Sequence, residues 1–201
     1  MTEGVEAAVQ AIRSGGLAVV PTDTVYGLAA SPQLEAPVRR LYRAKDRDPR
    51  QPTALLAPDL ATLLELVPEL GDRAASIATA LLPGPYTLVL PNPARRYGWL
   101  TGATPEAIGV RVPELTGPAR QLLDRVGALA ATSANLRGGP DPCTLDEVPV
   151  EIRHAADAVL DGGELTGTPS TVLDFTGPEP RVLREGAAPS AEALRLVATL
   201  V

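Results

Sequence analysis

The chain has 201 residues, which is enough for one well-buried domain and too few for two comfortable ones. Apolar residues make up 45% and charged residues 21%, a composition that is typical of a globular protein and excludes a disordered one. The formal net charge of −6 is the reverse of the basic excess of non-specific nucleic-acid binders, so we expect any RNA contact to come from a local patch. We predict a single domain over residues 1–201.

The single cysteine and single histidine exclude an internal disulfide and a Cys/His zinc site. Cys143 has no basic neighbour in the sequence, which favours a passive thiol, and His154 lies in a segment of alternating charge, which favours a surface or structural role. The first residues form neither a basic nor an apolar leader, and no stretch approaches about 20 apolar residues. We expect a cytoplasmic protein without membrane association.

The first half of the chain alternates helical and extended patterns. Apolar residues at helical spacing, followed by a double glycine, predict a helix over 3–14. The apolar run 17–20, ended by Pro21, predicts a buried strand that leads into a loop. The next expected elements are a helix at 35–45, a strand at 53–57, a helix at 60–67, a helical stretch at 77–82 and a strand at 86–90.

The second half continues the alternation. The expected elements are a strand at 108–112, a helix at 119–126, a strand at 128–132, strands at 171–175 and 181–184, and a last helix at 191–200. Ser190 is the predicted N-cap of that helix because its hydroxyl suits the position. Interleaved strands and helices predict one α/β domain.

A basic segment stands out in this acidic chain. Six of its 18 Lys and Arg residues lie within 39–50. They can complement the dipole at the end of the predicted helix, or they can bind a phosphate or carboxylate, for which Arg offers bidentate donors. The residues alone leave both interpretations open.

Two further features suggest a ligand site. Arg111 interrupts an otherwise apolar strand, which requires either a structural ion pair or a bound carboxylate. Ser133 and Asn135 follow a predicted buried strand, at the kind of strand end where open α/β sheets bind ligands, although such residues also make ordinary turns. The phosphate-binding motifs G-x-x-x-x-G-K-[ST] and G-x-G-x-x-G are absent from the sequence.

Seven stretches, in this order, resemble the YrdC-like family of threonylcarbamoyl-AMP synthases. They are PTDTVYGLAA (21–30), K-D-R (45–47) with Gln51-Pro52, PGPYTLVLP (83–91), VRVP (110–113), ATSAN (131–135), STVLD (170–174) and VLREG (182–186). The resemblance implies a twisted open mixed α/β sheet, flanked by helices, with a large concave basic cleft. It also implies the minimal single-domain form of the family.

The implied activity is that of a nucleotidyltransferase. L-threonine and bicarbonate would give a carbamate, which would attack the α-phosphorus of ATP to form threonylcarbamoyl-AMP and pyrophosphate. Magnesium would accompany ATP, without a dedicated protein metal site. The product would pass to a downstream complex that modifies an adenosine beside the tRNA anticodon, and the basic cleft could also contact tRNA.

The resemblance carries roles to matching residues. Threonine binding falls to Thr24, Arg111, Ala131 and Ser170, with Arg111 as partner of the carboxylate. ATP binding falls to Lys45, Arg47, Gln51, Ala107, Ser133, Asn135, Asp141 and Arg184, and Lys45 and Arg47 would also stabilise the charge that develops on the phosphates.

The chain departs from the family pattern at three places. Leu56 stands where some members have a histidine near threonine, Thr53 replaces an apolar residue, and Arg137 replaces a serine. Two alternatives remain beside the main hypothesis. One is a carbamoyl-adenylate-forming domain of the hydrogenase-maturation type, which usually accompanies Cys-rich modules, and the other is an RNA-binding module.

Overall fold

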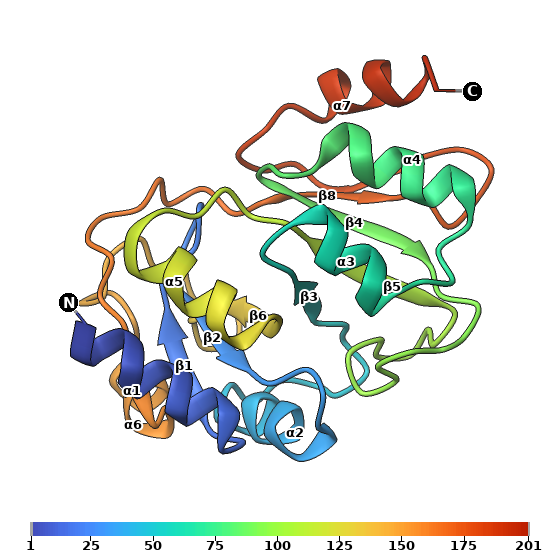
Figure 1. Ribbon diagram of the computed structural model, residues 1–201. Helices are drawn as coiled ribbons and strands as arrows, with labels where there is room; N and C mark the ends of the chain where they lie inside the picture. Colours follow the sequence, from blue (N-terminus) through green and yellow to red (C-terminus); the bar gives the residue numbers. More distant parts are fainter. Residues whose placement is uncertain (1, 201) are drawn as a thin grey trace.

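The computed structural model describes residues 2–200, and its framework is one nine-stranded mixed sheet with the order β7-β1-β2-β6-β3-β5-β4-β8-β9. The strands are β1 (Leu17–Val20), β2 (Gly27–Ala30), β3 (Ala54–Leu56), β4 (Tyr86–Pro91), β5 (Ala107–Arg111), β6 (Leu129–Ser133), β7 (Ala158–Val159), β8 (Thr171–Asp174) and β9 (Arg181–Arg184). The helices are α1 (Thr2–Arg13), α2 (Glu35–Ala44), α3 (Leu60–Leu66), α4 (Asp72–Leu81), α5 (Gly117–Val126), α6 (Val150–Ala155) and α7 (Ser190–Val197). Figure 1 shows α3, α4 and α7 grouped near β4 and β8, with α1 and α5 beside β1 and β2. The predicted α/β fold with a helix-flanked mixed sheet is confirmed.

The two faces of the sheet carry two separate apolar clusters because side chains alternate along each strand. In β1, Leu17 and Val19 join the larger cluster, whereas Ala18 and Val20 join the smaller one. Helices α2, α3, α4, α6 and α7 bury residues in the larger cluster, and α1 and α5 in the smaller one. One face is therefore covered by five helices, and the other by two.

The helix ends follow local capping rules. The carboxylate of Asp59 accepts a hydrogen bond from the backbone N–H of Thr62 at 2.7 Å, which satisfies a free donor at the start of α3. Gly127 ends α5 in the left-handed conformation, at φ 76°, which favours a residue without Cβ. Helix α5 packs against α1 over the smaller cluster.

Four local predictions need correction. Strand β2 was not predicted, because its sequence Gly-Leu-Ala-Ala lacks the β-branched residues that mark strands. Helix α6 was not predicted, and α4 begins at Asp72, five residues before the expected stretch. Ser190 does not cap α7, since the cap position belongs to Pro189 and the Ser190 hydroxyl donates to the carboxylate of Glu185.

Within residues 2–200, no helix is long and apolar enough to cross a membrane.

Candidate functional site

The half of the sheet that α1 and α5 leave uncovered forms a cavity of about 470 Å³. In β3, β4 and β5, alternate residues enter the larger cluster and their neighbours line the cavity. Strand β5 buries Ile108 and Val110 and turns Ala107, Gly109 and Arg111 into the cavity. The period of two explains how an arginine fits an apolar strand, because Arg111 belongs to the open face.

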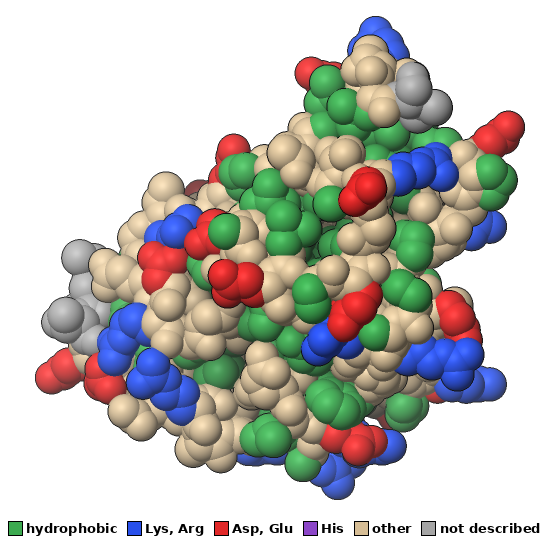
Figure 2. All heavy atoms as spheres, turned by 45° about the vertical axis from the view of Figure 1, so that its right-hand side comes forward, with side chains coloured by type: hydrophobic (Ala, Val, Ile, Leu, Met, Phe, Trp, Pro, Cys, Tyr) green, Lys and Arg blue, Asp and Glu red, His purple; other side chains and the backbone are tan. Residues whose placement is uncertain are grey.

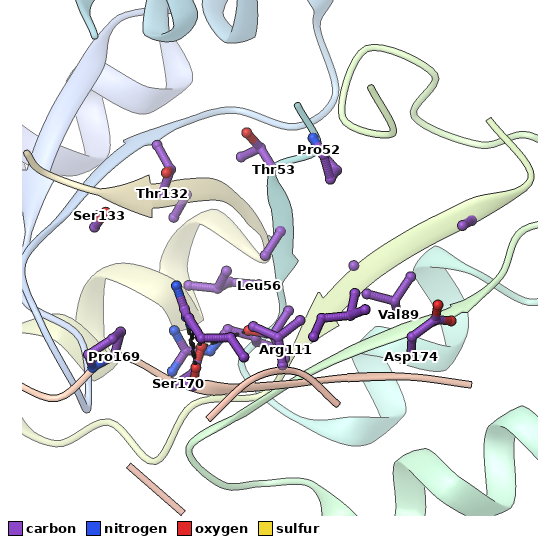
Figure 3. Close-up of a pocket in the computed structure, with 18 of the residues that line it drawn as sticks. Pro52, Thr53, Leu56, Val89, Arg111, Thr132, Ser133, Pro169, Ser170 and Asp174 are labelled. Atoms are coloured by element: carbon purple, nitrogen blue, oxygen red, sulfur yellow. Dashed lines mark hydrogen bonds between the residues drawn. The ribbon is translucent and has the colours of Figure 1, made fainter. Parts of the chain in front are cut away.

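Most of the residues predicted to bind threonine or ATP lie together on this wall. Those that line the cavity are Thr24, Arg47, Ala107, Arg111, Ala131, Ser133, Ser170 and Arg184. In Figure 3, Arg111 and Ser170 lie near each other, Leu56 stands beside Arg111, and Thr132 and Ser133 lie on the opposite side. The individual assignments to threonine or ATP stay predictions.

The remaining predicted residues lie just outside the lining. Lys45 is 4% exposed and donates hydrogen bonds to Ser133, the last residue of β6, and to Asn135 just after it. Asn135 and Asp141 belong to the same neighbourhood, since Asn135 accepts a hydrogen bond from Lys45 and the charge of Asp141 acts on the lysine. Gln51 is exposed, and its carbonyl oxygen accepts a hydrogen bond from the hydroxyl of Tyr42 at 3.0 Å.

Arg111 forms a buried ion pair that the sequence left as an alternative. Its Nη2 donates to Oδ1 of Asp23 at 2.6 Å, and the two side chains are 9% and 6% exposed. Burial of a guanidinium is costly without a partner, so the carboxylate stabilises the arginine where it stands. Arg111 also faces the cavity, so the ion pair does not prevent it from meeting a ligand carboxylate.

Ser170 and Arg184 form a second unit at the same end of the cavity. Arg184 donates through Nε and Nη2 to the carbonyl oxygen of Ser170, at 3.0 and 2.7 Å, and through Nη2 to the serine hydroxyl at 3.2 Å. The hydroxyls of Ser170 and Thr87 lie 2.8 Å apart. Antiparallel pairing of β8 and β9 brings Arg184 beside the start of β8, so these contacts follow from the register.

Lys45 is anchored by uncharged acceptors. Its ammonium group donates to the carbonyl oxygen of Ser133 and, at 2.9 Å, to Oδ1 of Asn135. Burial, with the nearby charge of Arg47, lowers the pKa of Lys45 from 10.5 to about 8, although Asp141 acts in the opposite direction. The lysine is therefore a cation that an arriving phosphate can stabilise, in a position fixed by β6.

Arg47 bridges two walls of the cavity. Nη1 donates to the hydroxyl of Thr132 at 2.9 Å, and Nη2 donates to the carbonyl oxygen of Pro52 at 2.6 Å. The guanidinium carbon lies 6.0 Å from the ring centroid of Tyr42, within reach of a cation–π contact. Within residues 2–200, the buried Nε of Arg47 has no hydrogen-bond partner.

The loop between β1 and β2 is held by hydroxyl and backbone contacts. The hydroxyl of Thr22 donates to the carbonyl oxygen of Val25 at 2.7 Å and lies 3.1 Å from that of Thr24. The carbonyl oxygen of Thr24 accepts from the Thr166 hydroxyl at 3.1 Å and from the Gly167 N–H at 3.0 Å. These bonds present Thr24 to the cavity in a fixed position.

The cavity concentrates cations in a chain of net negative charge. Its lining includes Arg47, Arg50, Arg111, Arg181 and Arg184. On the face in Figure 2, by contrast, Lys and Arg lie interspersed with Asp and Glu. Several of these arginines are bound to carboxylates, but Arg47 and Arg184 bind neutral oxygens and keep their charge available to an anion.

The donor set does not suggest a dedicated metal cage. No group of three or more His, Cys, Asp or Glu side chains in the described part of the chain could hold a metal ion. The lining carboxylate of Asp174 accepts from Arg181 and from the Thr176 hydroxyl and N–H.

Two residues of the site were not predicted from the sequence: Asp23, which contacts Arg111, and Thr132, which contacts Arg47. Leu56, which lines the cavity, was named only as a departure from the family pattern. A usable signal was the alternation in β5, where Ala107, Gly109 and Arg111 occupy every second position. His154 is exposed on α6, as expected. A neighbouring carboxylate, that of Glu147, raises the pKa of the Cys143 thiol, which agrees with a passive role.

Known proteins share this fold and sequence. The Sua5/YciO/YrdC family model, described as "Telomere recombination", matches residues 10–186. A threonylcarbamoyl-AMP synthase of Pyrococcus abyssi is 34% identical over 189 residues, which cover 92% of this chain and 55% of the relative. A human protein of the same name is 32% identical over 201 residues, covering 93% of this chain and 68% of the relative. The chain thus spans little more than half the length of the archaeal relative.

A solved structure agrees with the sequence comparison. The crystal structure of P. abyssi Sua5 complexed with L-threonine superposes with a TM-score of 0.86 and 33% identity, over 96% of this chain and 56% of that one. Sequence match, fold and the order of the seven stretches therefore agree. The chain belongs to the Sua5/YciO/YrdC family.

Proposed function

We propose that the chain is a threonylcarbamoyl-AMP synthase, which converts L-threonine, bicarbonate and ATP into threonylcarbamoyl-AMP and pyrophosphate. The observation that carries the proposal is one cavity with two chemically different ends. Arg111, Ser170 and Thr24 supply a cation and hydroxyls at one end. At the other end Arg47 lines the cavity and Lys45 lies just outside the lining, and both cations are held by neutral oxygens. Relatives that cover most of this chain are named for this activity, and one has been crystallised with L-threonine.

The reaction has two steps that balance. The threonine amine loses a proton and forms a C–N bond with the carbon of bicarbonate, and water leaves, which gives a carbamate. A carbamate oxygen then attacks the α-phosphorus of ATP and the bond to the β-phosphate oxygen breaks, which releases pyrophosphate. The carbamate is already an anion, so its attack needs no general base.

The side chains mainly position and stabilise charge. Arg111 would hold the threonine carboxylate, and the Ser170 and Thr24 hydroxyls would contact the rest of the amino acid. Lys45 and Arg47 would neutralise charge on the α-phosphate and the departing pyrophosphate, and their hydrogen bonds to backbone oxygens fix them before ATP arrives. Magnesium bound with ATP would contribute to the same neutralisation of phosphate charge.

The product is a mixed anhydride, so a second enzyme must consume it before water does. We propose that this step is the transfer of the threonylcarbamoyl group to an adenosine beside the anticodon of tRNA. A contact between tRNA and this chain would have to use local basic residues, because the net charge is −6.

The test is pyrophosphate release from ATP with threonine and bicarbonate omitted in turn, combined with mass spectrometry of the nucleotide product. We expect release to require both, with a product of the mass of threonylcarbamoyl-AMP. Release that ignores threonine, or that requires carbamoyl phosphate, would refute the proposal and favour a carbamoyl-adenylate-forming domain.

A further inference from the structure

Thr132 contacts Arg47 and has no part in the mechanism above. Arg47 lies between the end of α2 at Ala44 and the start of β3 at Ala54, outside any helix or strand. Thr132 lies on β6, which pairs with β2 on one side and with β3 on the other. Nη1 of Arg47 donates to the Thr132 hydroxyl at 2.9 Å. This hydrogen bond therefore joins a connecting segment to an interior strand of the sheet.

The other contacts of Arg47 are with residues close to it in sequence. Nη2 donates to the carbonyl oxygen of Pro52, and the guanidinium carbon lies 6.0 Å from the ring centroid of Tyr42. The backbone N–H of Arg47 donates to the carbonyl oxygen of Tyr42 at 2.9 Å. Within residues 2–200, the bond to Thr132, 85 positions away, is the only side-chain hydrogen bond of Arg47 that reaches a strand of the cavity wall.

Thr132 and Pro52 together fix the plane of the guanidinium, because each accepts from a different terminal nitrogen. In Figure 3, Thr132 lies on β6 and Pro52 precedes the neighbouring strand β3. Both acceptors are uncharged, so the cation is oriented without being neutralised. A guanidinium has five N–H donors, so one N–H on each terminal nitrogen stays free for a phosphate oxygen.

We propose that Thr132 is a positioning residue that acts through Arg47: its hydroxyl oxygen orients the guanidinium for the phosphates of ATP before the nucleotide binds. Without that oxygen, Nη1 loses its acceptor and the guanidinium can turn about its bond to Pro52. The N–H groups that a phosphate would meet are then displaced, and a displacement of about 1 Å is costly for a preorganised contact. The inference rests on the proposed function, because it concerns the end of the cavity that would bind ATP.

The test combines substitutions of Thr132 with a change of Arg47. Thr132→Val removes the hydroxyl but keeps the branched shape that suits a strand, and Thr132→Ser keeps the hydroxyl. Thr79→Val is a matched control, because its hydroxyl donates to the carbonyl oxygen of Ala75 on the exposed side of α4, away from the cavity lining. Thr132→Val is also made in an Arg47→Ala protein. The kcat and KM for ATP and threonine are measured by pyrophosphate release, with ATP labelled on the γ-phosphate so that slow variants stay measurable.

We expect Thr132→Val to lower kcat/KM for ATP by about tenfold or more, as is typical of a lost hydrogen bond to a charged group. The KM for threonine should change by less than about twofold, because the other end of the cavity is untouched. Thr132→Ser and Thr79→Val should stay within about threefold of the wild type. In the Arg47→Ala protein, Thr132→Val should change kcat/KM for ATP by less than about twofold, because the group that it positions is already gone.

An unchanged kcat/KM for ATP in folded Thr132→Val would overturn the inference. So would an equal loss in the wild-type and Arg47→Ala backgrounds, which is what a purely structural role produces, or a Thr132→Ser protein as impaired as Thr132→Val. Thr132→Ala, which also lacks the hydroxyl, repeats the comparison with Thr132→Ser if valine disturbs folding, and it should show the same loss. A wild-type protein that releases no pyrophosphate refutes the proposed function, whereas an active wild type with insensitive Thr132 variants refutes only the role of Thr132.

Discussion

Lys45 should make the use of ATP sensitive to pH just above neutrality. Burial lowers its pKa to about 8, so it is about 90% charged at pH 7 and about 10% charged at pH 9. A lysine is charged below its pKa, and only the charged form pairs well with phosphate. The kcat/KM for ATP reports ionisation of the free enzyme, so we expect it to fall by nearly tenfold between pH 7 and pH 9.

Substitution separates this effect from other titrations. Lys45→Arg keeps a positive charge over the whole range, so its kcat/KM for ATP should be lower overall but nearly flat between pH 7 and pH 9. Lys45→Ala should lose about 100-fold at pH 7, as expected for one preorganised electrostatic contact, and should also be flat. The assay is pyrophosphate release at saturating threonine and bicarbonate. A wild-type profile that stays level to pH 9, or one that Lys45→Arg reproduces, would refute the reasoning.

The same pKa predicts a change in stability. The unfolded chain holds the lysine proton up to a pKa near 10.5, while the folded protein releases it near 8. Between these values the unfolded state binds more protons, so this group makes the free energy of unfolding rise with pH. The shift lowers the free energy of unfolding by about 3 kcal/mol below pH 8, and this destabilisation disappears as the pH rises toward 10.5. The free energy of unfolding of the wild type and of Lys45→Met is measured by urea titration at pH 8 and pH 10. An equal change between the two pH values in both proteins would contradict the prediction.

Three further substitutions test the site and the core. Arg111→Ala should raise the KM for threonine by about tenfold or more and that for ATP far less, and equal increases in steady-state assays would contradict its assignment to the carboxylate. Leu88→Ala, at a position that is 0% exposed, should lower the free energy of unfolding by about 3 kcal/mol in urea titrations, and a loss below about 1 kcal/mol would contradict tight packing there. Gly186→Ala would place a Cβ within 2.6 Å of the Ser170 carbonyl oxygen, so threonine use should fall sharply, whereas Gly71→Ala, with nothing within 4 Å, should be neutral.

Much of the fold could be predicted because local patterns agreed with it. The strands at 17–20 and 181–184 have the predicted bounds, and α2 ends one residue early. Strand β2 was missed because its Gly-Leu-Ala-Ala sequence has no strand preference of its own, and pairing on both sides with β1 and β6 determines its conformation. Tertiary pairing here overrides local propensity, and a single sequence does not display pairing.

The site was predictable as a set of residues and not as a set of contacts. Thr24, Arg111 and Ser170 could be named from the motifs that contain them. The partner of Arg111 could not, because Asp23 reaches it only through the strand order of the whole sheet. Lys45 likewise gains its lowered pKa from burial against Ser133, at the end of β6, and Asn135, which lie 88 and 90 positions away in sequence. Electrostatics depends on such distant neighbours, so the residues predict which charges are present but not how strongly each is compensated.

The partners of the cations explain how an acidic chain can bind an anionic substrate. A cation held by a carboxylate is fixed but neutralised, whereas one held by a backbone carbonyl is fixed and keeps its charge. Lys45, Arg47 and Arg184 are of the second kind. Their positions are set before a ligand arrives, so a phosphate meets charges that need no reorganisation. The net charge of −6 is then compatible with ATP, because the field inside the cavity depends on the uncompensated cations in its wall and much less on screened charges outside.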